Sequence, residues 1–321
     1  MSKKEQNAPQ HIKRTTGDWI FDIAVIIFFC IFTFICIFPF YYLLINTISD
    51  NDLVTSGRVN FFPMLKNAEG NTIFGVQVNN YVALQNVQDL GSSVLVTVAR
   101  TLLGTALMVI TSAWAGYLVT KQKMWKRSFW YRFLVVTMYF NAGLVPWYMN
   151  MLMMGLTDNF LAYIIPGMVA PYNIILVKTY IESIPSSLEE SAVIDGASTL
   201  KVWLKIILPL SVPILATIAI FAAVNQWNSF QDNLLLITNR HDELDTLQYK
   251  LFQYISQANS LKALVSNTTN SNAVMAGLAT AATATSIRMS VTVVVVLPVM
   301  LIYPFFQRFF TKGIMIGAVK G

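Results

Sequence analysis

The sequence predicts an all-α integral membrane protein with six transmembrane helices, both termini in the cytoplasm, and a helical elbow in the last cytoplasmic loop. Of its 321 residues, 55% are hydrophobic and only 12% are charged, whereas a soluble domain carries about 25% charged residues. The apolar residues form runs of the ~20 residues that cross a bilayer. Lys and Arg gather in alternate loops, as the positive-inside bias requires. This placement accounts for the net charge of +6, so we expect no nucleic-acid partner.

The first half of the chain is expected to begin with a basic cytoplasmic tail over residues 1–18 and a first transmembrane helix over 19–46. That apolar run is too long for a signal-peptide core and lacks a small-residue cleavage site, so it is interpreted as an anchor. Residues 47–91 are too polar to cross and are expected to form an extracytoplasmic loop. The aromatic residues of this loop indicate a small packed cap: Phe61, Phe62, Phe74 and Tyr81.

The transmembrane core is expected over residues 92–310. The second, third and fourth spans of the chain are predicted over 92–120, 133–154 and 160–180. The elbow follows at 182–209 and a fifth span at 210–230. A polar and alanine-rich outer loop is expected over 231–285, a sixth span over 289–310 and a cytoplasmic tail over 311–321. Small residues such as Gly104 and Gly116 in the second span would let neighbouring helices approach closely. Arg100 in the same span is expected to have a structural pairing or interfacial role.

The elbow is the most polar stretch between two spans. Ser187 and Glu190 have the S-x-x-E spacing of a capping box, which predicts a helix start. Gly196 is expected to end that helix, because glycine adopts the left-handed conformation without a Cβ penalty. Ser198 or Thr199 would then cap a second short helix. The product is a helix–turn–helix between two membrane spans.

The same elbow resembles the EAA loop of permease subunits from binding-protein-dependent ABC importers. The resemblance rests on Glu190-Ser191-Ala192, on Asp195-Gly196 and on Ile206-Ile207-Leu208-Pro209 at the family's spacing. Ser191 departs from the usual alanine but keeps the side chain small. Further segments resemble carbohydrate importers of the maltose-transporter type, in the branch that handles oligosaccharides: Pro185 to Pro213 with Trp227-Asn228, Asn141 to Pro146, and Phe309 to Gly321.

The resemblance covers nearly all of residues 92–321 and implies a transport subunit. Such a chain forms, with a second permease subunit, a heterodimer that provides the translocation path for a carbohydrate in the plasma membrane of a bacterium. A cytoplasmic P-loop ATPase dimer binds ATP and Mg, and an extracytoplasmic sugar-binding lipoprotein delivers the cargo. The resemblance assigns ATPase docking to the elbow residues Glu189, Glu190, Ser191, Ala192, Asp195, Gly196, Ala197 and Ser198.

We expect this chain to bind no cofactor or metal and to carry no catalytic residue. It has no G-x-x-x-x-G-K-[ST] motif and therefore no P-loop of its own. His11 and His241 are its only histidines, and neither has a metal-binding spacing. Cys30 and Cys36 lie in one apolar run, which argues against a disulfide framework. An intramembrane enzyme is therefore a weak alternative.

The outer end of the fifth span is the candidate substrate path. Sugars favour hydrogen bonds to amides and stacking on aromatic rings, and this stretch offers both. Trp227 by itself is equally compatible with an interfacial aromatic belt. The candidate path residues are Asn141, Asn225, Gln226, Trp227, Asn228 and Asp232.

Two other transport functions remain open at this point. The elbow alone would permit an ABC importer permease for a non-sugar solute, although the C-terminal tail and Trp227-Asn228 argue against that. A stand-alone secondary transporter would show internal repeats and intramembrane charge pairs for ion coupling, and the sequence shows no convincing repeat.

Overall fold

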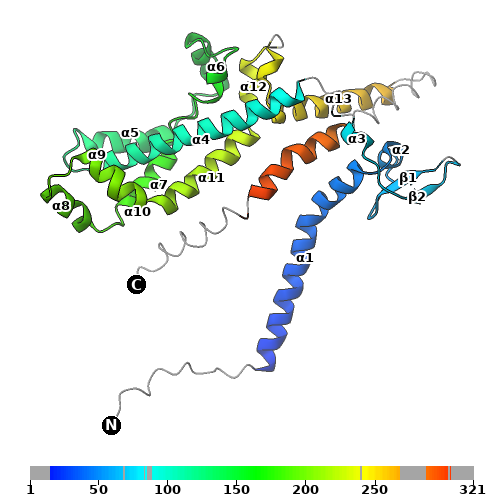
Figure 1. Cartoon of the computed structure of the whole chain (residues 1–321), viewed down its shortest axis with the longest axis horizontal. Helices are drawn as coiled ribbons and strands as arrows, with labels where there is room; N and C mark the ends of the chain where they lie inside the picture. The colour runs from blue at the N-terminus through cyan, green and yellow to red at the C-terminus, as the bar shows by residue number, and fades with distance from the viewer. Residues whose placement is uncertain are drawn as a thin grey trace. The chain divides into compact units, whose positions relative to one another are not determined.

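The computed structural model of the chain describes residues 15–67, 69–82, 84, 89–238, 241–267, 287–302 and 304. These residues are mostly helical, as the composition predicts (Figure 1). The chain divides into two compact units, Met1–Val78 and Asn79–Gly321.

The first unit is built on the long helix α1 (Thr16–Thr47). Thr15 and Asp18 form a reciprocal capping box that fixes its first turn. At 32 residues, α1 is about 48 Å long, which exceeds the hydrocarbon thickness of a bilayer. Its most apolar stretch is exposed on every side, and a helix that is apolar all round suits a lipid environment.

A short helix and a two-stranded ribbon follow α1 in the same unit. Helix α2 (Asn51–Thr55) is capped by Asp50, and β1 (Met64–Lys66) pairs antiparallel with β2 (Thr72–Phe74) in the register Leu65↔Ile73. The Tyr41 hydroxyl donates to the Phe61 carbonyl at 2.8 Å, which holds the connection to the ribbon against α1. The Phe61 ring lies 5.7 Å from the Phe38 ring, and the Phe62 and Phe74 rings lie 6.4 Å apart. All three of these loop side chains are more than half exposed, so the described residues do not form the packed cap that was expected. Tyr81 was expected in this cap but lies in α3 (Asn79–Val82) of the second unit.

The second unit is organised around α4 (Leu90–Thr120), which packs against α7 (Pro171–Ile181) and α11 (Val212–Asn228). A Cβ added at Gly116 would lie 2.9 Å from Val177 Cγ1, so only glycine allows α4 and α7 to pack this closely. The expected role of small residues in the second span is confirmed at this contact. The buried core between these helices and the elbow contains Met108, Tyr117, Val177, Ile181, Val202, Ile207 and Ile218.

The segments predicted as the third and fourth spans are broken helices rather than continuous ones. The third consists of α5 (Arg127–Tyr139) and α6 (Leu144–Met153). Gly143 separates them with φ of +88°, and Pro146 has no N–H with which to continue a helix. The fourth consists of the 3₁₀ turn η2 (Phe160–Tyr163) and of α7, which begins at Pro171 because the residue before a proline disfavours the helical conformation.

The described part of the predicted outer loop is itself helical. It contains α12 (Gln231–Leu236), the 3₁₀ turn η4 (Asp242–Leu244) and α13 (Leu247–Asn267). A further apolar helix, Ile287–Ile302, is drawn in orange-red in Figure 1 and packs against α13 through Leu247, Leu251, Val291 and Val295. The end of the predicted sixth span and the tail at 311–321 lie outside the described residues.

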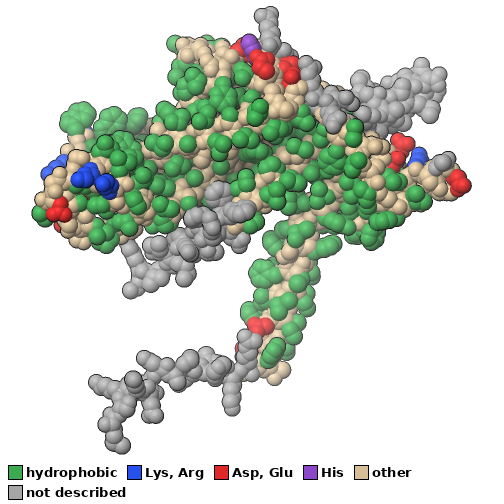
Figure 2. All heavy atoms as spheres, viewed as in Figure 1, with side chains coloured by type: hydrophobic (Ala, Val, Ile, Leu, Met, Phe, Trp, Pro, Cys, Tyr) green, Lys and Arg blue, Asp and Glu red, His purple; other side chains and the backbone are tan. Residues whose placement is uncertain are grey.

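Two of the described helices, α1 and α4, are long and apolar enough to cross a membrane. A third candidate is the pair Thr199–Leu210 and Val212–Asn228, whose two parts are bent by 78°. Figure 2 shows hydrophobic side chains over most of the visible face of the helices, with Lys and Arg gathered at the end that holds α8 (Ser186–Ile194).

Candidate functional site

The elbow begins with α8, and its start differs in detail from the expectation. Pro185 occupies the N-cap position, so Ser187 lies within the first turn and caps nothing. Its carbonyl instead accepts a hydrogen bond from the Ser191 hydroxyl at 2.8 Å. The predicted capping box between Ser187 and Glu190 is therefore wrong, although the helix does begin in this place. The reason is that Pro185, with its fixed φ, sets the start two residues before Ser187.

The turn of the elbow forms as the sequence predicts. Gly196 has φ of +77°. Its N–H donates to the Val193 carbonyl, and the Ala197 N–H donates to the Ala192 carbonyl at 2.9 Å. This is the Schellman arrangement, in which a left-handed residue satisfies the last carbonyls of a helix. The chain is thereby reversed at Gly196 through backbone bonds alone.

The second half of the elbow begins at α9 (Thr199–Val202), and Ser198 rather than Thr199 is its cap, since the Ser198 hydroxyl accepts from the Lys201 N–H at 3.4 Å. The π-helical segment η3 (Trp203–Ile207) and α10 (Leu208–Leu210) follow. Pro209 cannot donate to the carbonyl four residues before it, which accounts for the altered hydrogen bonding of η3.

The elbow is attached firmly to the helical core on one face. The rings of Trp203 and Trp114 meet edge to face with centroids 4.9 Å apart. Ala192 and Ala197 pack against the buried core around Val202 and Ile207. Their small side chains bring the elbow close to α4 and α7.

The opposite face of the elbow is open to solvent. It carries the exposed residues Glu190, Ser191, Asp195, Gly196 and Ser198. Ile194 between them is 85% exposed, and its neighbour Val193 is exposed as well, so the open face of the elbow is partly apolar. The residues expected to dock an ATPase therefore divide into this exposed set and three half-buried residues, Glu189, Ala192 and Ala197.

Charge pairs join the elbow to the basic loop after α4. Glu189 forms an ion pair with Lys121 and accepts from the Tyr117 hydroxyl at 3.4 Å. The Lys121 ammonium also lies 4.0 Å from the centre of the Tyr117 ring. Glu182, just before α8, pairs with Arg127 at 3.2 Å. The elbow and the basic loop therefore lie at one end of the core, as expected if both are on the same side of the membrane.

A cavity of about 370 Å³ opens between α4, α11 and the start of α7. Two of the candidate path residues, Asn225 and Gln226, line it. Tyr172 and Asn173 line it as well, and sequence analysis missed both. Polar side chains in an apolar span are the signal that could have found Asn173. The remaining lining residues are Gly104, Met108, Gly167, Ala170, Phe221 and Ala222.

Arg100 lies behind this cavity in a buried ion pair. Its side chain is 1% exposed, and its Nη2 lies 2.5 Å from Oδ2 of Asp232. It also donates to Oε1 of Gln226 at 3.0 and 3.2 Å, and it lies 4.4 Å above the Tyr163 ring. The structural pairing role expected for Arg100 is confirmed. Asp232 was assigned to the substrate path, and the structure places its carboxylate on this arginine.

A second buried network continues from the first at the next residue. Asn233 donates to Asp245 Oδ1 at 2.9 Å, and Lys250 lies 2.9 Å from the other oxygen of that carboxylate. The Leu247 N–H donates to the Thr97 hydroxyl at 2.9 Å, which connects α13 to α4. These polar residues were all assigned to an outer loop or overlooked, because the sequence does not show which distant residues pair.

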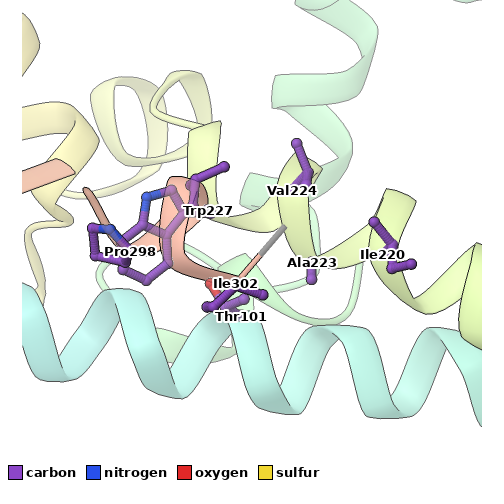
Figure 3. A pocket seen from close by; sticks show the side chains of 8 residues that line it. Thr101, Ile220, Ala223, Val224, Trp227, Pro298 and Ile302 are labelled. Carbon is purple, nitrogen blue, oxygen red and sulfur yellow. The ribbon is translucent and has the colours of Figure 1, made fainter. Parts of the chain in front are cut away.

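The remaining candidate path residues lie away from the cavity. Trp227 donates from its ring nitrogen to the Val295 carbonyl at 2.9 Å. It lines a separate apolar crevice together with Thr101, Pro298 and Ile302 (Figure 3). Asn228 is exposed, and Asn141 accepts from the Gly143 N–H at the break between α5 and α6. The structure therefore brings together only Asn225, Gln226 and, through Arg100, Asp232.

The part of the chain that the structure describes contains no group of three or more His, Cys, Asp or Glu residues placed to hold a metal ion.

Comparison with known proteins identifies the family. No protein-family model matches the chain. It is 31% identical over 302 residues to the polygalacturonan/rhamnogalacturonan transport system permease protein YtcP of Bacillus subtilis, covering 94% of this chain and 99% of that protein. The chain belongs to the permease subunits of ABC transporters. The permease is also 31% identical over 311 residues to Protein LplC of the same organism, covering 96% of this chain and 97% of that protein.

A solved structure supports the same assignment for the fold. The permease superposes with a TM-score of 0.76 on a chain of a bacterial ABC transporter involved in the import of the acidic polysaccharide alginate. The two are 29% identical, and the match covers 92% of this chain and 99% of that chain. The permease is therefore a membrane-embedded transport subunit and not an enzyme.

Proposed function

We propose that this permease is one of two transmembrane subunits of an ATP-driven importer that carries an oligosaccharide into a bacterial cell. The similarity to a polygalacturonan/rhamnogalacturonan permease over nearly the full length of both chains carries the proposal. The arabinooligosaccharides transport system permease protein AraQ of Halalkalibacterium halodurans, 26% identical over 233 residues, is a further relative named for oligosaccharides.

The geometry supports a division of labour within the chain. The cavity beside Asn225 and Gln226 offers amide groups next to the ring of Tyr172, which suits the hydroxyl groups and apolar faces of sugars. It would form the translocation path together with the second permease subunit. An extracytoplasmic sugar-binding lipoprotein would deliver the cargo to the outer side.

The elbow would be displaced when the partner ATPase binds and hydrolyses ATP. In this proposal the chain crosses the membrane six times, with both termini and the elbow in the cytoplasm. The exposed face around Glu190 and Ile194 docks in a partner ATPase dimer, which holds ATP and Mg. Because Trp203 and the small residues Ala192 and Ala197 fix the elbow to α4 and α7, a displacement of the elbow moves these helices rather than bending a loop.

Uptake and partner capture test the proposal together. The permease is deleted from its native cells, and uptake of labelled oligogalacturonides and arabino-oligosaccharides is compared with uptake in the parent. We expect uptake of at least one class to be lost and restored by the intact gene. A mild-detergent pull-down should recover a second permease, a P-loop ATPase and a sugar-binding lipoprotein. Recovery of a peptide- or metal-binding lipoprotein would favour a non-sugar importer, and recovery of the permease alone would overturn the proposal.

A further inference from the structure

Gln226 has an unusual position in the wall of the cavity, since its side chain connects the cavity to the buried Arg100–Asp232 pair. We infer that Gln226 is a specificity-determining hydrogen-bond donor for the carboxylate of an acidic sugar, and that Arg100 is the residue that positions it. This inference rests on the proposed function and deepens it by naming the class of cargo.

The hydrogen-bond partners of Gln226 distinguish its amide oxygen from its amide nitrogen. Arg100 can only donate, so the atom that faces its guanidinium is the amide oxygen, at 3.0 and 3.2 Å. The Tyr163 carbonyl can only accept, so the atom that faces it at 3.3 Å is the amide nitrogen. A flipped amide would bring donor against donor and acceptor against acceptor. The side chain of Gln226 therefore has one orientation.

Two glycines hold the amide nitrogen at the cavity wall. A Cβ added at Gly104 would lie 2.5 Å from Gln226 Nε2, and one added at Gly167 would lie 3.3 Å from the same atom. Both glycines line the cavity. The nitrogen therefore lies in a slot between α4 and the segment before α7, where any larger side chain would displace it.

The donor that remains is polarised by the arginine behind it. An amide nitrogen carries two N–H groups, and the Tyr163 carbonyl takes one. No second acceptor for this nitrogen lies among the described residues, so the other N–H is available to cargo. Because the amide oxygen accepts from a buried guanidinium, hydrogen-bond cooperativity makes the N–H a stronger donor. Asp232 balances the charge of Arg100, so the wall donates without carrying a net charge.

A donor of fixed direction discriminates between chemical groups. A sugar hydroxyl can donate as well as accept, and it therefore adapts to either end of an amide. An ionised carboxylate can only accept, and hydrogen bonds to it are among the strong ones. An amide such as that of Gln226, whose N–H is held toward the cavity, therefore binds the carboxylate of a uronate better than an amide that is free to flip.

The test uses the importer purified with its partners and reconstituted in liposomes, with trigalacturonate as cargo. Gln226→Met removes the donor and also the oxygen that accepts from Arg100, while the ion pair between Arg100 and Asp232 stays in place. We expect the KM for uptake to rise roughly tenfold or more, since a hydrogen bond to a charged group is lost. Vmax and recovery of the assembled complex should stay near the wild-type values. Gln231→Met, which makes the same change at the exposed start of α12, is the matched control.

Two further variants separate positioning from stability. Arg100→Lys keeps a cation beside Asp232 but loses the guanidinium fork, so the KM should rise while the complex still assembles. Gly104→Ala places a methyl group against Nε2 and should raise the KM with Gln226 unchanged in sequence. Gly104→Ala replaces Gln226→Met as the test variant if the complex that contains Gln226→Met does not assemble.

The outcomes distinguish this inference from the proposed function. An unchanged KM in Gln226→Met or Gly104→Ala, or an equal rise in Gln231→Met, overturns the inference while leaving the importer intact. Transport of neutral oligosaccharides but not of trigalacturonate by the wild type also overturns the inference alone. No uptake of any oligosaccharide by the wild-type complex overturns the proposed function itself.

Discussion

The polar residues beside the two ends of α4 differ in their exposure to solvent. At the C-terminal end, the elbow presents Glu190 and Asp195 to solvent, and its ion pairs, such as that of Glu189, are partly exposed. Near the N-terminal end, Arg100 and Asp232 are withdrawn from solvent, and Asp245 and Lys250 follow them. In Figure 1, α8 and α9 gather beside one end of α4, and α12 and α13 beside the other.

This difference in exposure matches two separate tasks, which are docking on a partner protein and selection of the cargo. An element that docks on a partner needs exposed groups on one face and a rigid attachment on the other, and the elbow has both. A cavity wall that selects cargo needs polar groups whose directions are fixed, and burial fixes them because each unpaired group would be costly. We therefore expect substitutions at the Arg100 end to act through stability and specificity, and substitutions on the elbow surface to act through coupling.

The largest effect on stability is expected at Arg100. Arg100→Ala leaves the Asp232 carboxylate, whose side chain is only 15% exposed, without its cation and should cost up to about 3–5 kcal/mol. The measurement is thermal unfolding of the purified permease in detergent. The double variant Arg100→Gln with Asp232→Asn should recover much of the loss, because the buried charge is removed together with its partner. A single variant as stable as the wild type would contradict the burial of this pair.

Gly196→Pro should have the largest effect on coupling. Proline fixes φ near −65°, whereas Gly196 has φ of +77°, and proline also removes the N–H that donates to Val193. We expect membrane insertion to persist and uptake to be abolished. Gly196→Ala, which costs about 1–2 kcal/mol in the left-handed conformation, should give an intermediate loss. Normal uptake by the proline variant would refute the role of the elbow.

A smaller effect is expected at the cap of α9. Ser198→Ala removes the side chain that accepts from the Lys201 N–H and should cost about 1 kcal/mol of helix stability. Uptake should fall in part, and hydrogen exchange at the start of α9 should become faster. Thr199→Ala is the matched control, since Thr199 is the first residue of α9 and not its cap. Equal effects of the two variants would argue against this capping.

The smallest expected effect separates two neighbouring glutamates. Glu189→Gln weakens a partly exposed ion pair with Lys121 and should change stability by less than about 1 kcal/mol, less so at high salt. Glu190→Gln changes an exposed carboxylate and should leave stability unchanged while lowering the ATPase recovered with the complex. Unfolding temperature and co-purified ATPase, measured for both variants, give the comparison. A reversed pattern would exchange the roles of the two residues.

Local sequence patterns were sufficient to predict the membrane class, the approximate extent of α1 and α4, and the turn of the elbow. Each follows from local physics. A run of apolar residues longer than the bilayer is thick requires a helix, Gly196 supplies a left-handed turn, and Ser198 supplies a cap. The local rule failed at Ser187, where Pro185 had already fixed the start of the helix.

Which polar residues form pairs became visible only in the folded chain. Arg100 and Asp232 are 132 positions apart, and nothing in their local sequence shows that α12 returns to α4. The same holds for the separation of Gln226 from Trp227, neighbours in sequence that face a polar cavity and an apolar crevice. Consecutive helical residues point about 100° apart, so the direction of each depends on what packs around the helix. Pairing between distant segments is a property of packing, and packing is settled only when the whole chain has folded.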